Sequence, residues 1–279
     1  MIICTGSNGF VGKHVQAAVD HMVKHPAYLV NVPPGGSSLS PSQVMPLPRI
    51  DYDGVIHLAG ISDTTCANWD RLKEANVKQT LELADSCCKA GVPFVYASSA
   101  SVYGNGRGAL NHYAESKSAI DASMANRPGH WYGARFFNVY GKGDEAKGDQ
   151  ASIVTKAVLA HRAGKVPSFF TPEAKRDYVH VSDVVNVLLW FLKERPASGI
   201  YDVGTGQQWS IKEVCQIAAQ ENYRRGFIPL SSVPAIAEIP VPAHMVGKCQ
   251  MDTKADLTRL RAAGYDKSFL SLEEGIKLL

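Results

Sequence analysis

Short apolar runs alternate with helical patterns along most of the chain. The runs typical of buried strands cover residues 1–5, 28–32, 54–60, 93–99, 131–138 and 199–203. The helical patterns, in which apolar positions recur three or four residues apart, cover residues 13–24, 69–90, 113–126, 152–163, 183–194 and 210–223. Such alternation is typical of parallel strands joined by helical crossovers. The pattern therefore predicts an α/β fold with a doubly wound parallel sheet.

The first strand runs directly into a glycine-rich turn, Gly6-x-x-Gly9-x-x-Gly12, which is followed at once by a helical pattern. Glycines at this place let the backbone approach a pyrophosphate, whose charge the start of the helix stabilises. An ordinary strand-to-helix turn that needs glycine for a positive φ is the alternative. The spacing departs from G-x-G-x-x-G, so it favours another branch of the Rossmann-type dinucleotide-binding folds over a simple dehydrogenase.

Tyr113 and Lys117 lie four residues apart in the predicted helix 113–126, so they share one face. An ammonium beside a phenol favours the phenolate and can make the tyrosine a general base. A free phenol has a pKa of about 10, and a base near neutrality needs a drop of roughly 3 units. The spacing also occurs on ordinary surface helices, so its meaning depends on the rest of the chain.

The regular alternation weakens after residue 140, and residues 227–246 are rich in proline. We predict a dinucleotide-binding Rossmann domain over residues 1–140, onto which residues 176–195 pack back, and a smaller carboxyl-terminal substrate-binding lobe over residues 141–279. Ligands of such sheets bind beyond the carboxyl ends of the strands. Ala59-Gly60 and Ser98-Ser99 should therefore lie at the same rim as the glycine turn.

The composition limits the classes of molecule that this protein is expected to bind. Charged residues make up 20% of the 279 residues and the net charge is +3, so no polybasic face indicates nucleic acid or a membrane as partner. The six cysteines show no C-x-x-C or Cys/His metal spacing, so we expect no metal site and a reduced, cytoplasmic setting. We also expect neither a signal peptide nor a membrane span. Small molecules remain as the expected ligands.

The chain resembles the extended short-chain dehydrogenase/reductases over nearly its whole length, because six motifs come in that family's order. They are Gly6-x-x-Gly9-x-x-Gly12, Leu58-Ala59-Gly60, Ser98-Ser99-Ala100-Ser101-Val102-Tyr103-Gly104, Tyr113-x-x-x-Lys117, Arg135-Phe136-Phe137-Asn138-Val139-Tyr140-Gly141 and Arg176-Asp177-Tyr178-Val179-His180-Val181-Ser182-Asp183. Within the family, the chain is similar to the ADP-glycero-manno-heptose 6-epimerases at residues 62–65, 69–70, 147–148, 151–152 and 256–267. The resemblance implies an NAD- or NADP-dependent epimerase of a nucleotide-diphosphate sugar.

The resemblance also implies the catalytic residues. Tyr113 would accept and donate the proton, while Lys117 would bind the nicotinamide ribose and lower the pKa of Tyr113. Ser99 would form a hydrogen bond with the reacting oxygen. Lys147 corresponds to a second acid/base on the opposite face of the sugar, with a solvated loop lysine as the alternative. Hydride would leave the sugar carbon for the nicotinamide and return to the other face, so no net oxidation results.

Binding roles follow from the same resemblance. Besides Lys117, the positions implied to bind the dinucleotide are Gly6, Gly9, Phe10, Val11, Gly12, Asn31, Ala59 and Gly60. The positions implied to bind the nucleotide-diphosphate sugar are Ser62, Asn138, Phe170, Arg176 and Tyr265. Arg176 offers the paired donors that suit a diphosphate, and a salt bridge to Asp177 or to another acidic residue is its alternative. His57 and His180 are expected inside the fold rather than as ligands.

Some features depart from the family pattern. Residues 33–48 form a short connection rich in Pro, Gly and Ser where a further helix is expected. Asn31 stands where an acidic residue often binds the adenosine ribose, which leaves both NAD and NADP open. Ala100-Ser101 replaces the Asp-Glu pair of the dehydratases, so a dehydratase is disfavoured.

Other functions remain open beside the heptose epimerase. A UDP-hexose 4-epimerase or a nucleotide-sugar reductase is the alternative activity, and a dinucleotide-binding regulatory protein is the alternative without catalysis. Retention of Ser99, Tyr113 and Lys117 together argues against an inactive protein. The helices at 69–90 and 113–126 correspond to helices that pair across subunits in the family, so a homo-oligomer is expected.

Overall fold

The computed structural model describes residues 1–21, 28–30, 52–171, 173–228, 236–243, 246–247 and 249–279. A six-stranded sheet forms its centre, with the strand order β10-β5-β4-β3-β1-β2, and every neighbouring pair is parallel. The strands are β1 (Ile2–Thr5), β2 (Tyr28–Val30), β3 (Gly54–His57), β4 (Phe94–Ser99), β5 (Trp131–Phe136) and β10 (Gly199–Val203). The predicted α/β fold with a doubly wound parallel sheet is confirmed.

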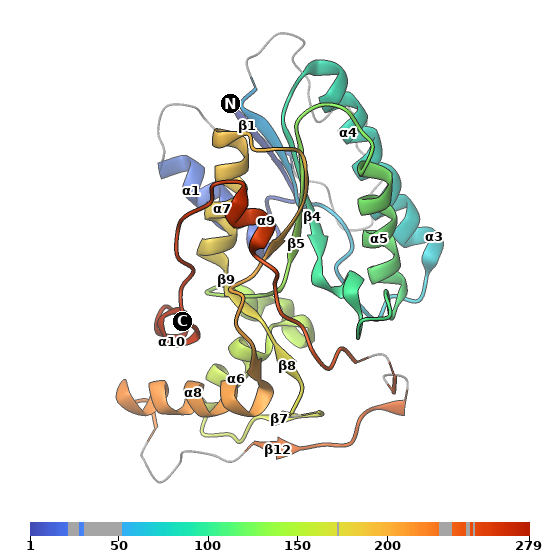
Figure 1. Ribbon diagram of the computed structural model, residues 1–279. Helices are drawn as coiled ribbons and strands as arrows, with labels where there is room; N and C mark the ends of the chain where they lie inside the picture. Colours follow the sequence, from blue (N-terminus) through green and yellow to red (C-terminus); the bar gives the residue numbers. More distant parts are fainter. Residues whose placement is uncertain (22–27, 31–51, 172, 229–235, 244–245, 248) are drawn as a thin grey trace.

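Helices cover both faces of this sheet (Figure 1). One face carries α1 (Phe10–His21) and α7 (Val181–Glu194), and the other carries α4 (Gln79–Ala90) and α5 (His112–Met124). The helix predicted at 69–90 is interrupted: a short α3 (Trp69–Leu72) leads into a π-helical segment, Lys73–Lys78, before α4 begins. Each face buries its own apolar cluster against the strands, as a sheet covered on both sides requires.

A second, smaller lobe lies below the carboxyl ends of the strands (Figure 1). Its helices are α6 (Ile153–Arg162), α8 (Ile211–Arg224) and α10 (Leu272–Lys277), which share one apolar cluster with Tyr140 and Tyr178. Short strands pair around them: β6 (Asn138–Tyr140) with β9 (Tyr178–His180), β8 (Lys175–Arg176) with β11 (Trp209–Ser210), and β7 (Ser168–Phe169) with β12 (Ala237–Glu238).

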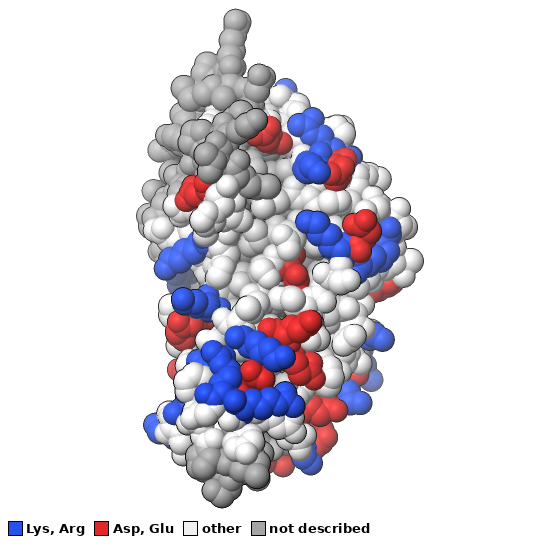
Figure 2. Space-filling view, turned by 90° about the vertical axis from the view of Figure 1, so that its left-hand side faces the viewer, with Lys and Arg blue, Asp and Glu red and all other residues white. Residues whose placement is uncertain are grey.

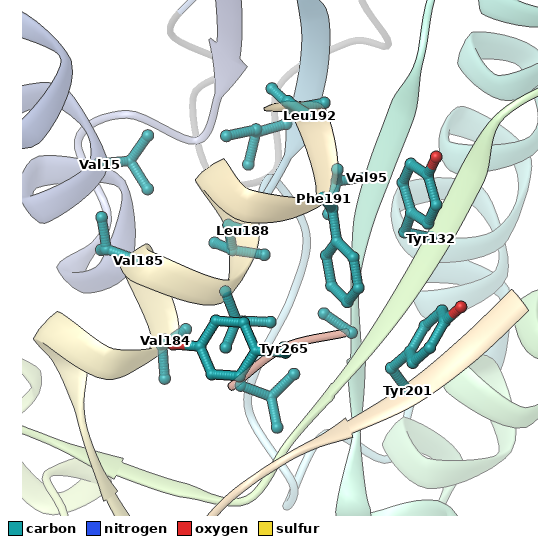
Figure 3. Close-up of a cluster of buried hydrophobic side chains, with 14 of the residues drawn as sticks. Val15, Val95, Tyr132, Val184, Val185, Leu188, Phe191, Leu192, Tyr201 and Tyr265 are labelled. Carbon is teal, nitrogen blue, oxygen red and sulfur yellow. The ribbon is translucent and has the colours of Figure 1, made fainter. Parts of the chain in front are cut away.

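The two parts are more interleaved along the chain than a boundary at residue 140 implies. β10 pairs with β5 and completes the main sheet, although it lies well inside the predicted lobe. The carboxyl-terminal segment with α9 (Thr258–Ala262) also returns to the main domain, where Leu260 and Tyr265 are buried in the cluster formed by α7 and the sheet (Figure 3). Among the described residues, the smaller lobe therefore consists mainly of residues 141–171, 173–176, 206–228, 236–243 and α10.

Charge is mixed on the face shown in Figure 2, where acidic and basic side chains alternate instead of forming a region of one sign. Within the described residues, no helix is long and apolar enough to cross a membrane. Asn31 and residues 33–48, to which the sequence assigned the adenosine end of the cofactor site, lie outside the described residues.

Candidate active site

The glycine turn between β1 and α1 is closed so tightly that side chains are excluded from it. Gly6 has φ +73°, and a Cβ there would lie 2.6 Å from the backbone nitrogen of Ala59. A Cβ at Gly12 would collide with the Gly6 carbonyl oxygen, and the Gly9 N–H donates to that same oxygen at 2.9 Å. The turn leads into the first residues of the 12-residue α1, which leaves its initial N–H groups without helical partners. This cradle fits the pyrophosphate of a dinucleotide.

Tyr113 and Ser99 meet above the carboxyl end of the sheet. Ser99 is the last residue of β4 and Tyr113 is in the first turn of α5, whose N-cap Asn111 accepts a hydrogen bond from the Ala114 N–H. The hydroxyl groups of Tyr113 and Ser99 form a hydrogen bond that lowers the pKa of Tyr113, but burial raises that pKa by more. In the protein alone the phenol is thus harder to ionise than an ordinary tyrosine, and a further positive charge is needed to make it a base.

Lys117 lies beside Tyr113 as the helical spacing predicts. Its Nζ donates to the Ala97 carbonyl oxygen at 2.7 Å and lies 5.9 Å from the centre of the Tyr113 ring. Burial lowers the pKa of Lys117 to about 8, and the nearby carboxylate of Asp121 opposes that decrease. The ammonium is therefore fixed in a place where it can act on the phenol, although it donates to the strand rather than to Tyr113.

Asp121 was not recognised in the sequence, yet it joins the Tyr113 site to the sheet. Its buried carboxylate accepts hydrogen bonds from the hydroxyl groups of Tyr96 and Ser98, both at 3.0 Å, and from Nε of Arg135 at 2.8 Å. The signal that could have revealed it is its place four residues after Lys117, which puts it on the same face of α5.

Asn76 is a second residue that the sequence reasoning missed. It lies in the π-helical segment, buried, where its amide oxygen accepts from the Ile61 N–H at 2.7 Å and its NH₂ donates to the Ile61 carbonyl and to the Ser116 hydroxyl, both at 3.0 Å. These bonds fix the strand end at Ala59-Gly60 against α5. Single π-helical turns occur frequently at functional sites, and no pattern in the sequence distinguishes this turn from a regular helix.

His57 is buried within the fold, as expected. Its Nδ1 lies 2.7 Å from the Thr5 hydroxyl and its Nε2 3.1 Å from the Thr80 hydroxyl, which itself donates to the Asn76 carbonyl. Thr80 must therefore accept from Nε2–H, and Thr5 must donate to Nδ1. Burial, with the charge of Lys117, lowers the pKa of His57 to about 3, so this histidine stays neutral.

Lys147 lies on a 3₁₀ segment that covers residues Asp144–Gln150. Its Nζ pairs with the Asp144 carboxylate at 2.7 Å and lies 4.4 Å from the centre of the Phe10 ring. Phe10 is the first residue of α1, directly after the glycine turn. The structure thus brings Lys147 to the glycine turn, with its side chain 35% exposed.

A cavity of about 720 Å³ lies between the sheet and the smaller lobe. Its wall includes Thr64, Thr65, Ser101, His112, Glu115, Asn138, Gln150, Ser152, Lys156, Phe169, Phe170, Arg176, Cys249 and Gln250. Ser101 and His112 are chain neighbours of Ser99 and Tyr113, so the cavity adjoins the Tyr113 site. Of the residues predicted to bind the sugar nucleotide, Asn138, Phe170 and Arg176 line it.

Arg176 brings an unneutralised cation to this cavity. Its guanidinium donates to the Gln250 carbonyl, and in the described part of the chain it forms no ion pair with a carboxylate. The alternative, a salt bridge to Asp177, is excluded because the Asp177 carboxylate accepts from the backbone of Thr205, Gly206 and Ala255 instead. A half-buried arginine without an acidic partner is well suited to an anionic ligand.

Two predicted substrate contacts lie elsewhere. Tyr265 is only 1% exposed and packs edge-on against Trp190 with ring centres 5.3 Å apart, within the core of the main domain (Figure 3). The prediction that Tyr265 binds substrate is corrected for this reason: burial in the core keeps its hydroxyl from the cavity. Ser62 is exposed but does not line the cavity, whereas its neighbours Thr64 and Thr65 do.

Comparisons with known proteins agree with this geometry. Residues 2–204 match the model of the NAD dependent epimerase/dehydratase family. The chain is similar to ADP-L-glycero-D-manno-heptose-6-epimerase from Helicobacter pylori, with 25% identity, a TM-score of 0.78 and coverage of 99% of this chain and 93% of that chain. It is also similar to MoeE5 in complex with UDP-glucuronic acid and NAD, with 23% identity, a TM-score of 0.79 and coverage of 99% and 96%.

A third solved structure is UDP-glucose 4-epimerase from Thermus thermophilus in complex with NAD, with 22% identity, a TM-score of 0.76 and coverage of 99% of this chain and 96% of that chain. These matches confirm the resemblance drawn from the sequence motifs. Their names refer to different sugars, so they leave the substrate open.

Proposed function

Because the chain belongs to the NAD-dependent epimerase/dehydratase family, we propose that it epimerises ADP-glycero-manno-heptose at C6 by transient removal and return of a hydride. A nicotinamide dinucleotide, when bound, supplies the hydride acceptor and donor and brings positive charge to the Tyr113 site. Gly6, Gly9 and Gly12 would hold its pyrophosphate, with Phe10, Val11, Ala59 and Gly60 beside it and Lys117 at the nicotinamide ribose. Asn31 is proposed for the adenosine ribose.

The single observation that carries the heptose proposal is the position of Lys147. An epimerase must take a proton from a hydroxyl in one configuration and give one to an oxygen in the other. Tyr113, oriented by Ser99, is the group on the α5 side, and we assign the second role to Lys147, which lies beside Phe10 at the glycine turn. Two such groups fit a reaction in which the carbonyl is protonated from different faces.

The cavity supports a nucleotide-diphosphate sugar as the substrate. Its volume of about 720 Å³ falls within the range of roughly 300–1,000 Å³ that is usual for small-molecule sites. We assign the diphosphate to Arg176 and Asn138 and the nucleoside to the aromatic wall at Phe170. Ser62 does not line the cavity and Tyr265 is buried in the core, so neither residue is assigned a substrate contact.

The test is direct incubation of the purified protein with each C6 epimer of ADP-glycero-manno-heptose, followed by NMR of the heptose. We expect either epimer to give the same mixture with no net oxidation or reduction of cofactor. Interconversion of UDP-glucose and UDP-galactose without action on the heptose would instead assign the 4-epimerase activity. Stoichiometric consumption of reduced cofactor would assign a reductase.

We also propose a homo-oligomer in which α4 and α5 pair across subunits. α4 and α5 together cover one face of the sheet and lie at the outside of the domain (Figure 1). Light scattering at micromolar concentration is expected to give a multiple of 30.2 kDa, and a monomer would contradict this assembly.

A further inference from the structure

Asp144 is a carboxylate with no exposure to solvent, at the start of the 3₁₀ segment that carries Lys147. One of its oxygens lies 2.7 Å from Nζ of Lys147, and the other accepts a hydrogen bond from the Ser152 N–H at 2.8 Å. A buried carboxylate is costly unless a cation and hydrogen bonds compensate it. Within the described residues, Lys147 is the cation that does so.

The pair fixes a side chain that would otherwise have great freedom. A lysine has four rotatable bonds, and its confinement costs up to about 2 kcal/mol of rotamer entropy. Lys147 is held on one side by Asp144 and on the other by the ring of Phe10, which is part of the wall of the glycine turn. Both contacts hold the ammonium beside Phe10, the first residue of α1 after the glycine turn.

We propose that Asp144 is the positioning residue for Lys147, and that its buried carboxylate holds the ammonium where it can protonate the sugar carbonyl. The inference rests on the proposed function, in which Lys147 is the second proton-handling group. In that step Nζ would give its proton to the sugar oxygen, while a bound reduced nicotinamide would supply the hydride for the carbonyl carbon. The Lys147 N–H bond and the nicotinamide C–H bond would break, O–H and C–H bonds would form on the sugar, and the neutral amine would remain beside Asp144.

Asp144→Asn tests the charge with little change of shape, because the amide oxygen can still accept from the Ser152 N–H. We expect turnover of ADP-heptose to fall tenfold or more with KM within twofold. In a single-turnover experiment, the epimer that Tyr113 deprotonates reduces the cofactor, and the rate of this reduction in the variant should stay within twofold of the wild-type rate. Glu145→Gln is the matched control, since Glu145 is the exposed carboxylate next to Asp144 and accepts from the Gly143 N–H, and it should keep wild-type turnover.

A double-mutant cycle separates positioning from a purely structural role. If Asp144 acts through Lys147, the variant with both Asp144→Asn and Lys147→Ala should turn over no more slowly than Lys147→Ala alone. Additive losses, or an Asp144→Asn variant within twofold of wild type while Lys147→Ala is impaired, would overturn the positioning role. Full activity of Lys147→Ala would instead overturn the second acid/base in the proposed function, and the inference with it.

The unfolding temperature of Lys147 variants tests whether the Asp144–Lys147 pair stabilises this segment. This measurement does not require turnover, and it does not require the Asp144 variant to fold. A guanidinium can keep the pair with Asp144 but cannot give up its proton. Lys147→Arg should therefore unfold at the wild-type temperature yet be inactive, whereas Lys147→Ala should unfold several degrees lower. Equal unfolding temperatures of the two variants would show that the pair does not hold this segment.

Discussion

The two sides of the active site differ in how they are built. Tyr113 and Ser99 lie on a helix and at the end of a central strand, where the surrounding hydrogen bonds to Asp121 and Asn76 tie them to the sheet. Lys147 lies on a 3₁₀ segment of the connection between the sheet and the smaller lobe, and one ion pair and one ring contact hold it. Sites on regular elements are positioned more accurately than sites on loops.

This difference indicates that the two sides of the candidate active site have different roles. The Tyr113 side is built on a strand and a helix of the main domain, so it is suited to the proposed proton step, which needs a fixed geometry. The Lys147 side depends on a segment that can change without disturbing the sheet, so it is suited to setting which reaction follows. Substitutions on the two sides should therefore have effects of different kind and size.

The largest effect is expected from Tyr113→Phe. The change removes the titrating oxygen and leaves the ring, so turnover should fall by about 10²–10⁴-fold, the usual contribution of a general acid–base group. Cofactor binding, measured by fluorescence titration, should remain within twofold, and the unfolding temperature should be close to that of wild type. Turnover within a few-fold of wild type would remove Tyr113 from the mechanism.

The next effect concerns binding rather than chemistry. Arg176→Ala should raise KM for the sugar nucleotide about 10- to 100-fold with little change in kcat, because a hydrogen bond to a charged group contributes roughly 1.5–3 kcal/mol. Lys175→Ala is the control, since Lys175 is the exposed neighbour on the same strand. An equal rise in KM for both variants would show that Arg176 acts only through net charge.

The Tyr113 side should also have a characteristic pH dependence. Burial lowers the pKa of Lys117 to about 8, so the ammonium beside Tyr113 is present below pH 8 and is lost as the pH rises through that value. The logarithm of kcat/KM should therefore decline above about pH 8. Asp121 raises the pKa of Lys117, so Asp121→Asn should move this decline to lower pH.

Ser98→Ala is the matched control for Asp121→Asn. It removes one of the hydrogen bonds to Asp121 but keeps the carboxylate charge, so its alkaline limb should stay near that of wild type. Identical shifts in the two variants would mean that packing rather than the charge of Asp121 sets the profile.

The sequence predicts the sheet and the Tyr113 side well, and the reason is physical. The strands and the helix faces follow from local periodicity, and Tyr113 and Lys117 are four residues apart in one helix. The positions of Lys147 and Arg176 depend on contacts between distant segments, so the motif alone names them without giving their partners. Asp144, Asp121 and Asn76 were missed because their roles appear only when burial and hydrogen bonds are known.

Tyr265 shows the limit of that reasoning most clearly. The stretch 256–267 resembles the heptose epimerases, and the resemblance predicts a substrate contact at Tyr265. The structure instead packs this stretch, which contains α9, against α7, where Tyr265 contacts Trp190, and Tyr265 also contacts Phe269. The sequence similarity in this stretch is therefore explained by the packing of the carboxyl-terminal segment on the main domain rather than by a substrate contact.

The smallest effect is accordingly expected from Tyr265→Phe. Burial raises the pKa of the Tyr265 phenol to about 12, so the group stays un-ionised at any working pH and has no charge to offer a ligand. The substitution keeps the ring and its contacts, so KM for ADP-heptose should stay within twofold of wild type and the free energy of unfolding within about 1 kcal/mol. A tenfold rise in KM, of the size expected for Arg176→Ala, would require the carboxyl-terminal segment to leave the core and enter the cavity during turnover, and would make the two regions one site.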